Sequence, residues 1–257
     1  MSYEERKQII LGELAFCNQL SFHEIEKIVD AAPTTIRRDL ARMAAEGVVE
    51  RFHGGVKIGS EVAEYSMRQK QAMHSEEKRL LGQEAARHLA PNELVFIGGG
   101  STTYSMIEFI EETNISVITN SLPHAETLHR RGIRTFLLCG FLRTRTRSLG
   151  GAETVRLMRE YRFDRSFIGA GGIGGNLRIL SADQSEYEIK EAALELSRRT
   201  YVLADASTFG LTAMYHSDFL RHEGATLITD NPACERDDRI VVVRPERPCD
   251  DARPASR

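Results

Sequence analysis

Several residue types that mark particular protein classes are scarce or absent in this chain. It has no tryptophan and only four cysteines, which stand far apart with no C-x-x-C pair and no histidine pattern near them: Cys17, Cys139, Cys234 and Cys249. This spacing argues against a zinc site and against a disulfide framework. The chain also lacks an apolar run long enough to cross a bilayer and an apolar leader after Met1. We therefore expect a soluble cytoplasmic protein with reduced thiols and no bound metal or cofactor.

A net positive charge is absent as well, since 34 Lys and Arg residues are outnumbered by 37 Asp and Glu residues and the pI is near 6.3. A protein that coats nucleic acid without sequence preference is usually strongly basic. Any affinity for nucleic acid must then reside in a local basic surface. The 257 residues, 41% of them hydrophobic, suffice for one small and one medium domain with full cores.

The stretch from Pro33 to Leu40 has the composition of a helix that binds DNA. Proline is well tolerated in the first turn of a helix, because its missing N–H would have no intrahelical partner there. Ile36, Leu40 and Met43 then fall on one face at helical spacing. The remaining surface carries hydroxyls and guanidiniums: Thr34, Thr35, Arg37, Arg38 and Arg42. These groups suit phosphate oxygens and guanine edges, so we predict a recognition helix that binds duplex DNA.

The segment before this helix supplies the scaffold of a helix-turn-helix. Apolar spacing predicts a first helix from Tyr3 to about Phe16. Ser21, with Glu24 three residues later, forms the capping box of a second helix. A short turn then leads to Pro33.

The segment after the recognition helix predicts a wing. The helix is expected to end at Gly47, and residues 48–52 and 56–58 are expected to pair as two strands around Gly54-Gly55. The wing adds three candidate DNA contacts: Arg51, His53 and Lys57. The alternative is a three-helix protein-binding module with a solvated arginine face. Helix, turn, basic helix and hairpin in this order favour a winged helix-turn-helix.

The remainder of the chain divides into a connection, a second domain and a tail. Residues 59–75 are polar and have no strong apolar period, so we interpret them as a linker. After a helix that starts at Ser75, helical patterns alternate with seven runs that we predict as strands: Leu94–Ile97, Ile115–Thr119, Thr135–Cys139, Ser166–Ala170, Tyr201–Ala204, Ala225–Thr229 and Ile240–Val243. The pattern predicts a Rossmann-like α/β domain with a mainly parallel sheet covered on both faces. The boundaries are thus 1–58, 59–75, 76–244 and 245–257, the last a disordered tail with three prolines.

Small polar residues gather where the predicted strands end, which is where ligands bind in open α/β sheets. The first strand is followed by Gly98-Gly99-Gly100-Ser101-Thr102-Thr103. Glycines let backbone N–H groups approach an anion, while hydroxyls and a following helix add donors. We therefore predict that this turn binds a phosphate group. It lacks the lysine of a nucleoside triphosphate loop and the third glycine of a dinucleotide fold. A tight turn that binds nothing is the alternative.

Other strand ends and one helix offer further candidates. Residues with donors, acceptors or flexible backbone near these ends are Asn120, Ser121, Gly171, Asp205, Ser207 and Thr208. Glu186 and Lys190 stand four apart near a helix start, where they support the helix or contact a sugar. Arg143, Arg145 and Arg147 either clamp a phosphate or form a solvated or subunit-contacting face. We expect these strand ends and the glycine-rich turn to form a site for a small phosphorylated metabolite.

Many of these strings resemble the sequence motifs of DeoR-type bacterial transcriptional regulators. The similar strings are Thr35-Ile36-Arg37-Arg38-Asp39-Leu40, Arg51-Phe52-His53-Gly54-Gly55, Gly100-Ser101-Thr102-Thr103, Thr119-Asn120-Ser121, Leu203-Ala204-Asp205 and Phe209-Gly210. The resemblance covers nearly the whole chain. It implies a sensor domain similar in fold to ribose-5-phosphate isomerase and coenzyme A transferases. It also implies a repressor that responds to a phosphorylated sugar or a related metabolite.

Three positions depart from the family pattern. The family usually has Ser where this chain has Ala32, Asp where it has Gly98, and Lys where it has Thr208. The first change removes an N-cap acceptor, and the other two remove a partner for sugar hydroxyls and one for phosphate. The last two also weaken the alternative of a sugar-phosphate isomerase-like or transferase-like enzyme, which needs a base and an oxyanion-stabilising group. We therefore expect a DNA-binding regulator of carbohydrate metabolism and no enzymatic activity. Because one short helix reads few bases, we expect a homo-oligomer, either dimer or tetramer.

Overall fold

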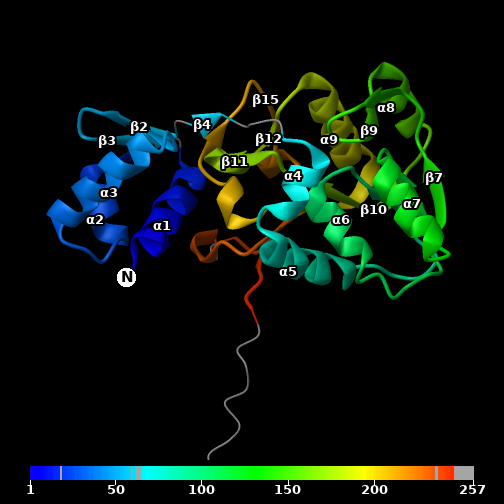
Figure 1. Ribbon diagram of the computed structural model, residues 1–257, viewed down its shortest axis with the longest axis horizontal. Helices are drawn as coiled ribbons and strands as arrows, with labels where there is room; N and C mark the ends of the chain where they lie inside the picture. The colour runs from blue at the N-terminus through cyan, green and yellow to red at the C-terminus, as the bar shows by residue number, and fades with distance from the viewer. Residues whose placement is uncertain (18, 59, 62–64, 235–236, 246–257) are drawn as a thin grey trace, which may run out of the picture.

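The computed structural model describes residues 1–17, 19–58, 60–61, 65–234 and 237–245. A small N-terminal domain of helices and a hairpin packs beside a larger α/β domain (Figure 1). Within the described residues, no helix has the length and apolar character needed to span a membrane. The predicted tail lies outside the described residues except for Pro245.

The N-terminal domain is the predicted winged helix-turn-helix. Its helices are α1 (Tyr3–Phe16), α2 (Phe22–Ile28) and α3 (Pro33–Ala45), and its strands are β1 (Gln19–Ser21), β2 (Val49–Phe52) and β3 (Gly55–Ile58). The capping box is present, because the Ser21 hydroxyl accepts from Glu24 N–H and the Glu24 carboxylate accepts from Ser21 N–H. The sheet has three strands in the order β1-β3-β2, one more than predicted. β1 was not predicted, because a strand of three residues is too short to show an alternation of apolar and polar residues.

The second domain is built on a seven-stranded parallel sheet in the order β17-β16-β13-β10-β5-β6-β7. The strands are β5 (Leu94–Ile97), β6 (Ser116–Thr119), β7 (Arg134–Leu137), β10 (Phe163–Gly169), β13 (Ser197–Leu203), β16 (Ala225–Thr229) and β17 (Ile240–Val242). They are the seven predicted strands, with ends displaced by a few residues. The prediction of a parallel α/β domain is therefore confirmed.

Helices cover both faces of this sheet. They are α5 (Ser75–Ala86), α6 (Ser101–Ile107), α7 (Leu122–Arg130), α8 (Ala152–Met158) and α9 (Gln184–Leu196). On one face Val95, Ile97 and Phe167 pack with α5, α6 and α7. On the other face Phe96 and Ile168 pack in the cluster that holds the buried residues of α8 and α9. Alternate residues of each strand thus face opposite cores, which explains the nearly continuous apolar runs of the sequence.

Several short elements surround the sheet and were not predicted. They are β8 (Phe141–Arg143), β9 (Ser148–Gly150), β11 (Gly172–Gly174), η1 (Gly175–Leu177), β12 (Arg178–Ser181), η2 (Ala206–Thr208), β14 (Leu211–Thr212), β15 (Tyr215–Asp218), η3 (Phe219–Arg221) and η4 (Pro232–Cys234). β8 and β9 form a hairpin, and β11, β12 and β15 form an antiparallel sheet of three strands.

The connection between the domains differs from the predicted linker. It contains β4 (Ser60–Glu61), which pairs in parallel with β14, and α4 (Met67–Ala72), which contacts α6. Of the six residues of α4 only Met67 is buried, so the helix has almost no apolar period. Its order comes from tertiary contacts that a sequence pattern does not reveal.

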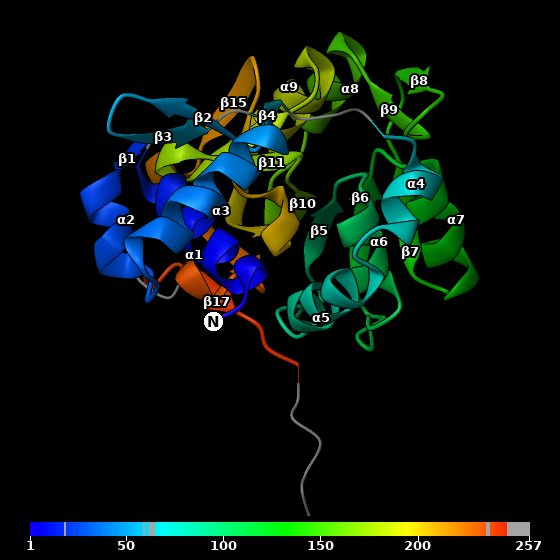
Figure 2. The same ribbon diagram turned by 60° about the vertical axis from the view of Figure 1, so that its left-hand side comes forward.

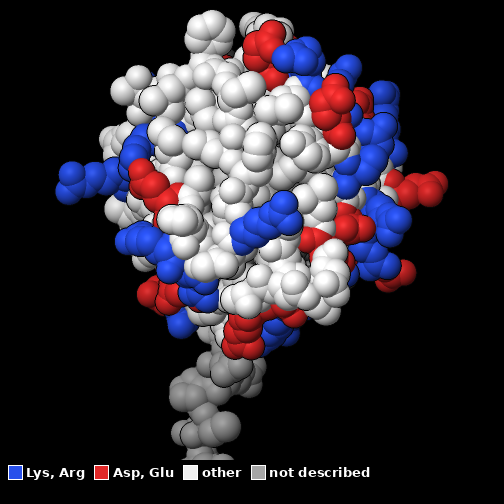
Figure 3. Space-filling view, turned by 90° about the vertical axis from the view of Figure 1, so that its right-hand side faces the viewer, with Lys and Arg blue, Asp and Glu red and all other residues white. Residues whose placement is uncertain are grey.

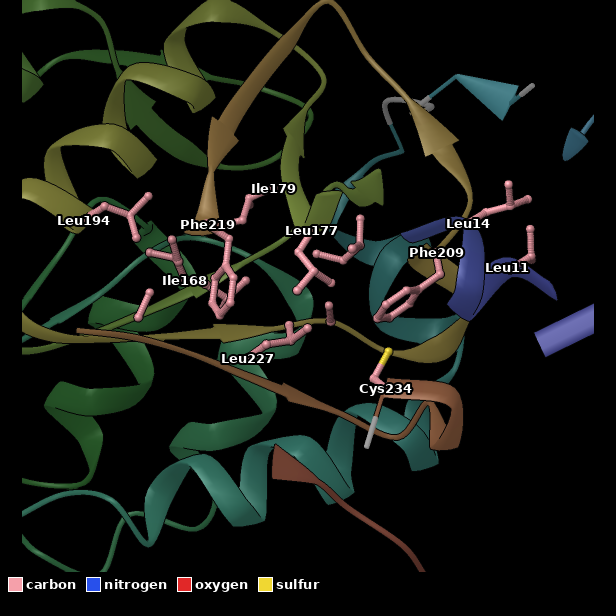
Figure 4. Close-up of a cluster of buried hydrophobic side chains, with 14 of the residues drawn as sticks. Leu11, Leu14, Ile168, Leu177, Ile179, Leu194, Phe209, Phe219, Leu227 and Cys234 are labelled. Atoms are coloured by element: carbon pink, nitrogen blue, oxygen red, sulfur yellow. The ribbon is translucent and has the colours of Figure 1, made fainter. Parts of the chain in front are cut away.

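The first helix joins the two domains by direct packing. Leu11 and Leu14 of α1 belong to the same buried cluster as Phe209 and Cys234 of the α/β domain (Figure 4). The approach is close, because a Cβ atom built on Gly12 would lie 2.3 Å from the Cβ atom of Ala233. The small domain is therefore held against the large one by α1 as well as by the pairing of β4 with β14.

Candidate nucleic-acid interface and effector site

The recognition helix α3 begins at Pro33, as predicted, and its N-cap Ala32 makes no side-chain capping hydrogen bond. Ile36, Leu40 and Met43 are buried against the rest of the small domain. The predicted contacts on the other face are open: Thr34, Arg37, Arg38 and Arg42 are exposed, and Thr35 is half-buried. The sequence therefore places hydroxyls and guanidiniums on the outer face of a helix whose inner face is fixed.

A buried ion pair that the sequence analysis did not identify anchors this helix. Arg6 of α1 donates from Nε to Oδ2 of Asp39 over 2.6 Å, and the two side chains are only 10% and 6% exposed. This hydrogen bond raises the pKa of Arg6. Removal of one partner would leave the other charge buried and unpaired. The pair thus fixes the rotation of α3 relative to α1, and with it the direction of the outer face.

Two of the arginines on α3 also pack on aromatic rings. The guanidinium of Arg42 lies 3.8 Å from the centre of the Tyr3 ring and its Nε is 3.0 Å from Oε1 of Glu46. The Arg37 guanidinium lies 4.9 Å from the centre of the Phe22 ring. These contacts orient both arginines, and Arg42 is held toward α1 at the C-terminal end of the helix.

The wing places its three candidate contacts in solvent. Arg51, His53 and Lys57 are all exposed, and Lys57 forms an ion pair of 2.7 Å with Glu50 on the neighbouring strand. The hairpin between β2 and β3 turns at Gly54, whose φ of +95° suits glycine. Together with α3 the wing forms the candidate nucleic-acid interface.

The candidate effector site lies at the carboxyl ends of β5, β6, β10 and β13, where two cavities are found. Predicted residues that line the first are Gly98, Gly99, Gly100, Asn120, Glu186 and Lys190. Predicted residues that line the second, of about 260 Å³, are Ser101, Thr102, Gly171, Asp205, Ser207 and Thr208. The structure thus brings together side chains from four strand ends and from α9.

Two of the predicted residues, Thr103 and Ser121, line neither cavity and are buried instead. The Thr103 hydroxyl donates to Gly98 O over 2.6 Å and lies 3.1 Å from His124 Nε2. The Ser121 hydroxyl lies 2.6 Å from His124 Nδ1. Burial lowers the pKa of His124 to about 3, so the ring is neutral and uses one nitrogen as donor and the other as acceptor. These hydroxyls hold the glycine-rich turn in place.

The glycine-rich turn itself is partly committed to structural hydrogen bonds. Gly98 N–H donates to Phe167 O over 2.9 Å, and Gly99 N–H donates to Asn120 Oδ1 over 2.8 Å. Tyr104 N–H makes the first bond of α6, to Gly100 O, so the N–H groups of residues 101–103 precede the intrahelical ladder. A Cβ atom on Gly98 would meet its nearest neighbours at 3.4 Å, which is ordinary contact. The first carbon of a side chain would therefore meet no clash at this position.

The ion pair of Glu186 and Lys190 forms one wall of the first cavity. Lys190 Nζ lies 3.0 Å from Glu186 Oε1 and also donates to Leu180 O and Ser181 Oγ over 3.0 and 3.1 Å. Three acceptors use all three donors of an ammonium group. Burial would raise the pKa of Glu186, but Lys190, Lys70 and Arg143 outweigh burial and lower this pKa to about 2. Glu186 is therefore an ionised acceptor that Lys190 holds in place.

Asp205 and its neighbours form a wall of the second cavity. Asp205 is buried, and its Oδ1 accepts hydrogen bonds from the Ser207 N–H and from the Ser207 hydroxyl. The Thr208 hydroxyl donates to Asp205 O over 2.7 Å. These bonds fix the η2 turn, and Asp205 is held beside the second cavity.

Met67, Lys70 and Arg143 also line the first cavity, and of these the sequence analysis considered only Arg143, as a candidate phosphate clamp. Met67 and Lys70 lie on α4, inside the segment interpreted as a linker. Arg143, one of the three alternating arginines, forms an ion pair with Asp183 at the start of α9. Arg147 is instead paired with Glu126 over 3.5 Å on the surface, and Arg145 accepts from Met67 N–H through its carbonyl. No local pattern marks Met67 and Lys70, because their place at the cavity depends on tertiary packing.

Two family models of known proteins match this chain. The family model of the DeoR-like helix-turn-helix domain matches residues 6–62, and that of the DeoR C terminal sensor domain matches residues 73–231. The chain is 32% identical to the uncharacterized HTH-type transcriptional regulator FruR of Bacillus subtilis, with 88% of this chain and 90% of the relative covered.

Two further proteins show a more distant likeness. A lactose phosphotransferase system repressor of Staphylococcus epidermidis is 30% identical, with 85% of this chain and 88% of the relative covered. Ribose 5-phosphate isomerase A of Methanocaldococcus jannaschii is 19% identical over 51% of this chain and 52% of that chain, with a TM-score of 0.38.

Proposed function

The chain belongs to the DeoR family of DNA-binding transcriptional regulators, and from that premise we propose that it represses a carbohydrate-metabolism operon and is controlled by a small phosphorylated metabolite. The matched relatives are named as regulators, so the alternative of an isomerase-like or transferase-like enzyme is set aside. The effector that best fits the proposal is a sugar phosphate.

The observation that carries the proposal is the chemistry of the two cavities. They combine an ionised carboxylate at Glu186, a second carboxylate at Asp205 and the cationic side chain of Lys70. Carboxylates accept from sugar hydroxyls, while ammonium groups and free backbone N–H groups bind phosphate. A ligand with hydroxyls and a phosphate uses both kinds of group. The name of the S. epidermidis relative, lactose phosphotransferase system repressor, supports the same class of regulated genes.

For the nucleic-acid interface we propose that the outer face of α3 enters the major groove while the wing contacts the backbone. The exposed Thr34, Arg37 and Arg38 support base and phosphate contacts. Arg51, His53 and Lys57 support backbone contacts beside them. We also propose that the protein is cytoplasmic and binds paired half-sites as a homo-oligomer.

The direct test has two steps that use the full-length protein. Genomic fragments retained by the protein are sequenced, and the retained fragment is then used in gel-shift assays with and without a panel of phosphorylated metabolites. The panel comprises glycerol 3-phosphate, ribose 5-phosphate, fructose 6-phosphate and inorganic phosphate, each beside its unphosphorylated parent where one exists. The proposal expects one discrete fragment next to carbohydrate genes and a changed affinity with at least one phosphorylated compound. Retention of random fragments, or no response to any phosphorylated compound, would contradict it.

A further inference from the structure

Lys70 occupies an unusual position between the two cavities. It lies on α4, in the connection between the domains, yet it lines both the first and the second cavity. Its charge reaches Glu186 in the first cavity, because Lys70 is, after Lys190, one of the cations that lower the pKa of that carboxyl group. A ligand that fills either cavity therefore meets this ammonium group.

The other basic side chains near the cavities are already engaged. Lys190 is bonded to three acceptors, and Lys78 donates from Nζ to the carbonyls of Lys70 and Met73. Arg143 is paired with Asp183. By contrast, Lys70 has no ion pair and no side-chain hydrogen bond with any residue in the described ranges. Among the cations that line the cavities, it is the one whose charge an incoming anion can neutralise without breaking an existing bond.

The backbone of α4 is fixed at both ends, so Lys70 is held over the cavities. At the start of the helix, Ser66 and Gln69 form a capping box, and Met67 N–H donates to Arg145 O over 2.9 Å. At the end, Lys78 of α5 binds the last carbonyls of α4. A cation at this end of a helix is favourable because the carbonyls lack intrahelical partners. Because the helix is already ordered, binding of a phosphate to Lys70 requires little further loss of conformational entropy.

The same helix is reached directly from the DNA-binding domain. β3 of the wing is followed by β4, which pairs with β14 at Leu211 and Thr212, and the chain then continues to α4 (Figure 2). Leu211 lines the second cavity together with Lys70. Contacts at the cavities are thus made by the polypeptide segment that leaves the wing.

We propose that Lys70 is the cation that binds the phosphate of the effector, so that the effector binds the connection between the two domains and not only the α/β domain. This inference rests on the proposed function, since it assumes a phosphorylated effector. It assigns the connection a direct part in ligand binding. It also predicts that affinity for the phosphate group, and not for the sugar hydroxyls, depends on Lys70.

The test compares Lys70→Gln with Arg68→Gln in the full-length protein. Arg68 lies on the same helix and carries the same charge, but it is exposed and lines neither cavity. Binding of the panel above is measured by isothermal titration calorimetry, after thermal unfolding without ligand has shown that both variants are folded. Loss of one charge-assisted hydrogen bond should weaken binding of the phosphorylated compound by about 10- to 100-fold in Lys70→Gln. Arg68→Gln should stay within about twofold of wild type, and Lys70→Arg should recover part of the loss.

The outcomes separate the inference from the proposed function. If a phosphorylated compound binds wild type and Lys70→Gln equally well, the role of Lys70 is wrong while the proposed function stands. An equal loss in Lys70→Gln and Arg68→Gln would also overturn it, since the effect would then be general electrostatics of the helix. If no phosphorylated compound of the panel binds wild type, the proposed function fails and the inference fails with it.

Discussion

Two arginines on the second turn of α3 carry the DNA-binding hypothesis at the scale of single residues. Arg37 and Arg38 are exposed, and no ion pair engages either of them in the part of the chain that the structure describes. We expect Arg37→Ala and Arg38→Ala each to weaken operator binding by about 1–3 kcal/mol if the guanidinium contacts a base edge. Fluorescence anisotropy with the retained genomic fragment measures this change, and Arg87→Ala at the C-cap of α5, in the α/β domain, is the control. Unchanged affinity in both variants would show that α3 is not the helix that contacts the operator bases.

The loss of an arginine should also change the salt dependence of binding in a diagnostic way. A phosphate contact releases counterions, so its removal reduces the slope of affinity against salt by about one unit. Removal of a base contact leaves most of that slope unchanged but weakens the preference of the protein for its operator sequence. The two measurements together therefore separate phosphate contacts from base contacts for each arginine.

His124 gives a pH-dependent prediction that does not involve DNA. Its pKa is lowered from 6.5 to about 3 by burial between Thr103 and Ser121. As the pH falls below about 6.5, the unfolded chain takes up a proton that the folded chain refuses, so the free energy of unfolding must fall. We expect His124→Gln, which keeps a donor and an acceptor, to show a shallower loss of stability between pH 7 and pH 5 in urea unfolding.

The control for this prediction is His129→Gln, because His129 is exposed on the same helix α7. Its stability profile against pH should match that of wild type. Parallel profiles for wild type and His124→Gln would show that the buried ring does not cause the acid sensitivity.

At the scale of elements, the packing of α1 on the α/β domain depends on the absence of a side chain at Gly12. Glycine inside a helix is unfavourable by about 0.5–1 kcal/mol relative to alanine. Yet a Cβ atom at this position would lie 2.3 Å from Ala233 Cβ, so one of the two elements must move. We expect Gly12→Ala to destabilise the protein by about 1–3 kcal/mol, because overpacking outweighs the gain in helix propensity.

The double variant Gly12→Ala/Ala233→Gly tests the cause of this effect. It removes the one methyl group that the new Cβ atom would strike, so the domain contact should recover. Thermal unfolding of the single and double variants gives the coupling between the two positions. Additive losses in the double variant would show that the domains do not pack tightly at Gly12.

The elements also show what sequence alone predicts well and what it does not. The seven strands of the parallel sheet were predicted because strands buried on both faces form apolar runs such as Leu94–Ile97. Pro33 and the capping box at Ser21 fixed two helix starts through local chemistry. α4 and β4 were missed because one buried residue, Met67, and a two-residue strand leave no period to detect.

The residues of the candidate effector site also fall into those that the sequence predicts and those that it does not. Glu186 and Asp205 stand at strand or helix ends and line the cavities, so their positions follow from topology. Thr103 and Ser121 have the same chemistry but face His124, and a sequence does not show which way a hydroxyl on a short helix turns. Lys70 comes from a segment outside the sheet, so only tertiary structure brings it to the site.

For the whole molecule, one side of the α/β domain has the features of a contact between subunits. β7 is an edge strand of the large sheet, with β6 as its neighbour in the described residues. Phe136 on this strand is 46% exposed, and Phe141 and Leu142 on the nearby hairpin are 82% and 54% exposed. Figure 3 shows the face of the molecule on the side of β7, where most of the Lys, Arg, Asp and Glu side chains lie toward the periphery of the view. Exposed apolar side chains beside an open strand edge are typical of a protein interface.

We propose that the partner for this surface is a second copy of the chain. Operators of helix-turn-helix proteins contain two half-sites that mirror the two-fold symmetry of a dimer. We expect light scattering to show at least a dimer for wild type and a shift toward monomer for Phe141→Asp, because a buried unpaired carboxylate disfavours association. Met214→Asp is the matched control, since Met214 is 85% exposed in the bend just before β15.

DNA binding gives the second readout of the same prediction. Phe141→Asp should lose affinity for a two-half-site operator but keep the wild-type affinity for an isolated half-site, because the change lies in the α/β domain and leaves α3 and the wing intact. Met214→Asp should bind both DNAs like wild type. A wild-type protein that is strictly monomeric yet protects both half-sites from cleavage would show that paired recognition does not depend on this surface. An oligomer that persists in Phe141→Asp would place the subunit contact elsewhere on the molecule.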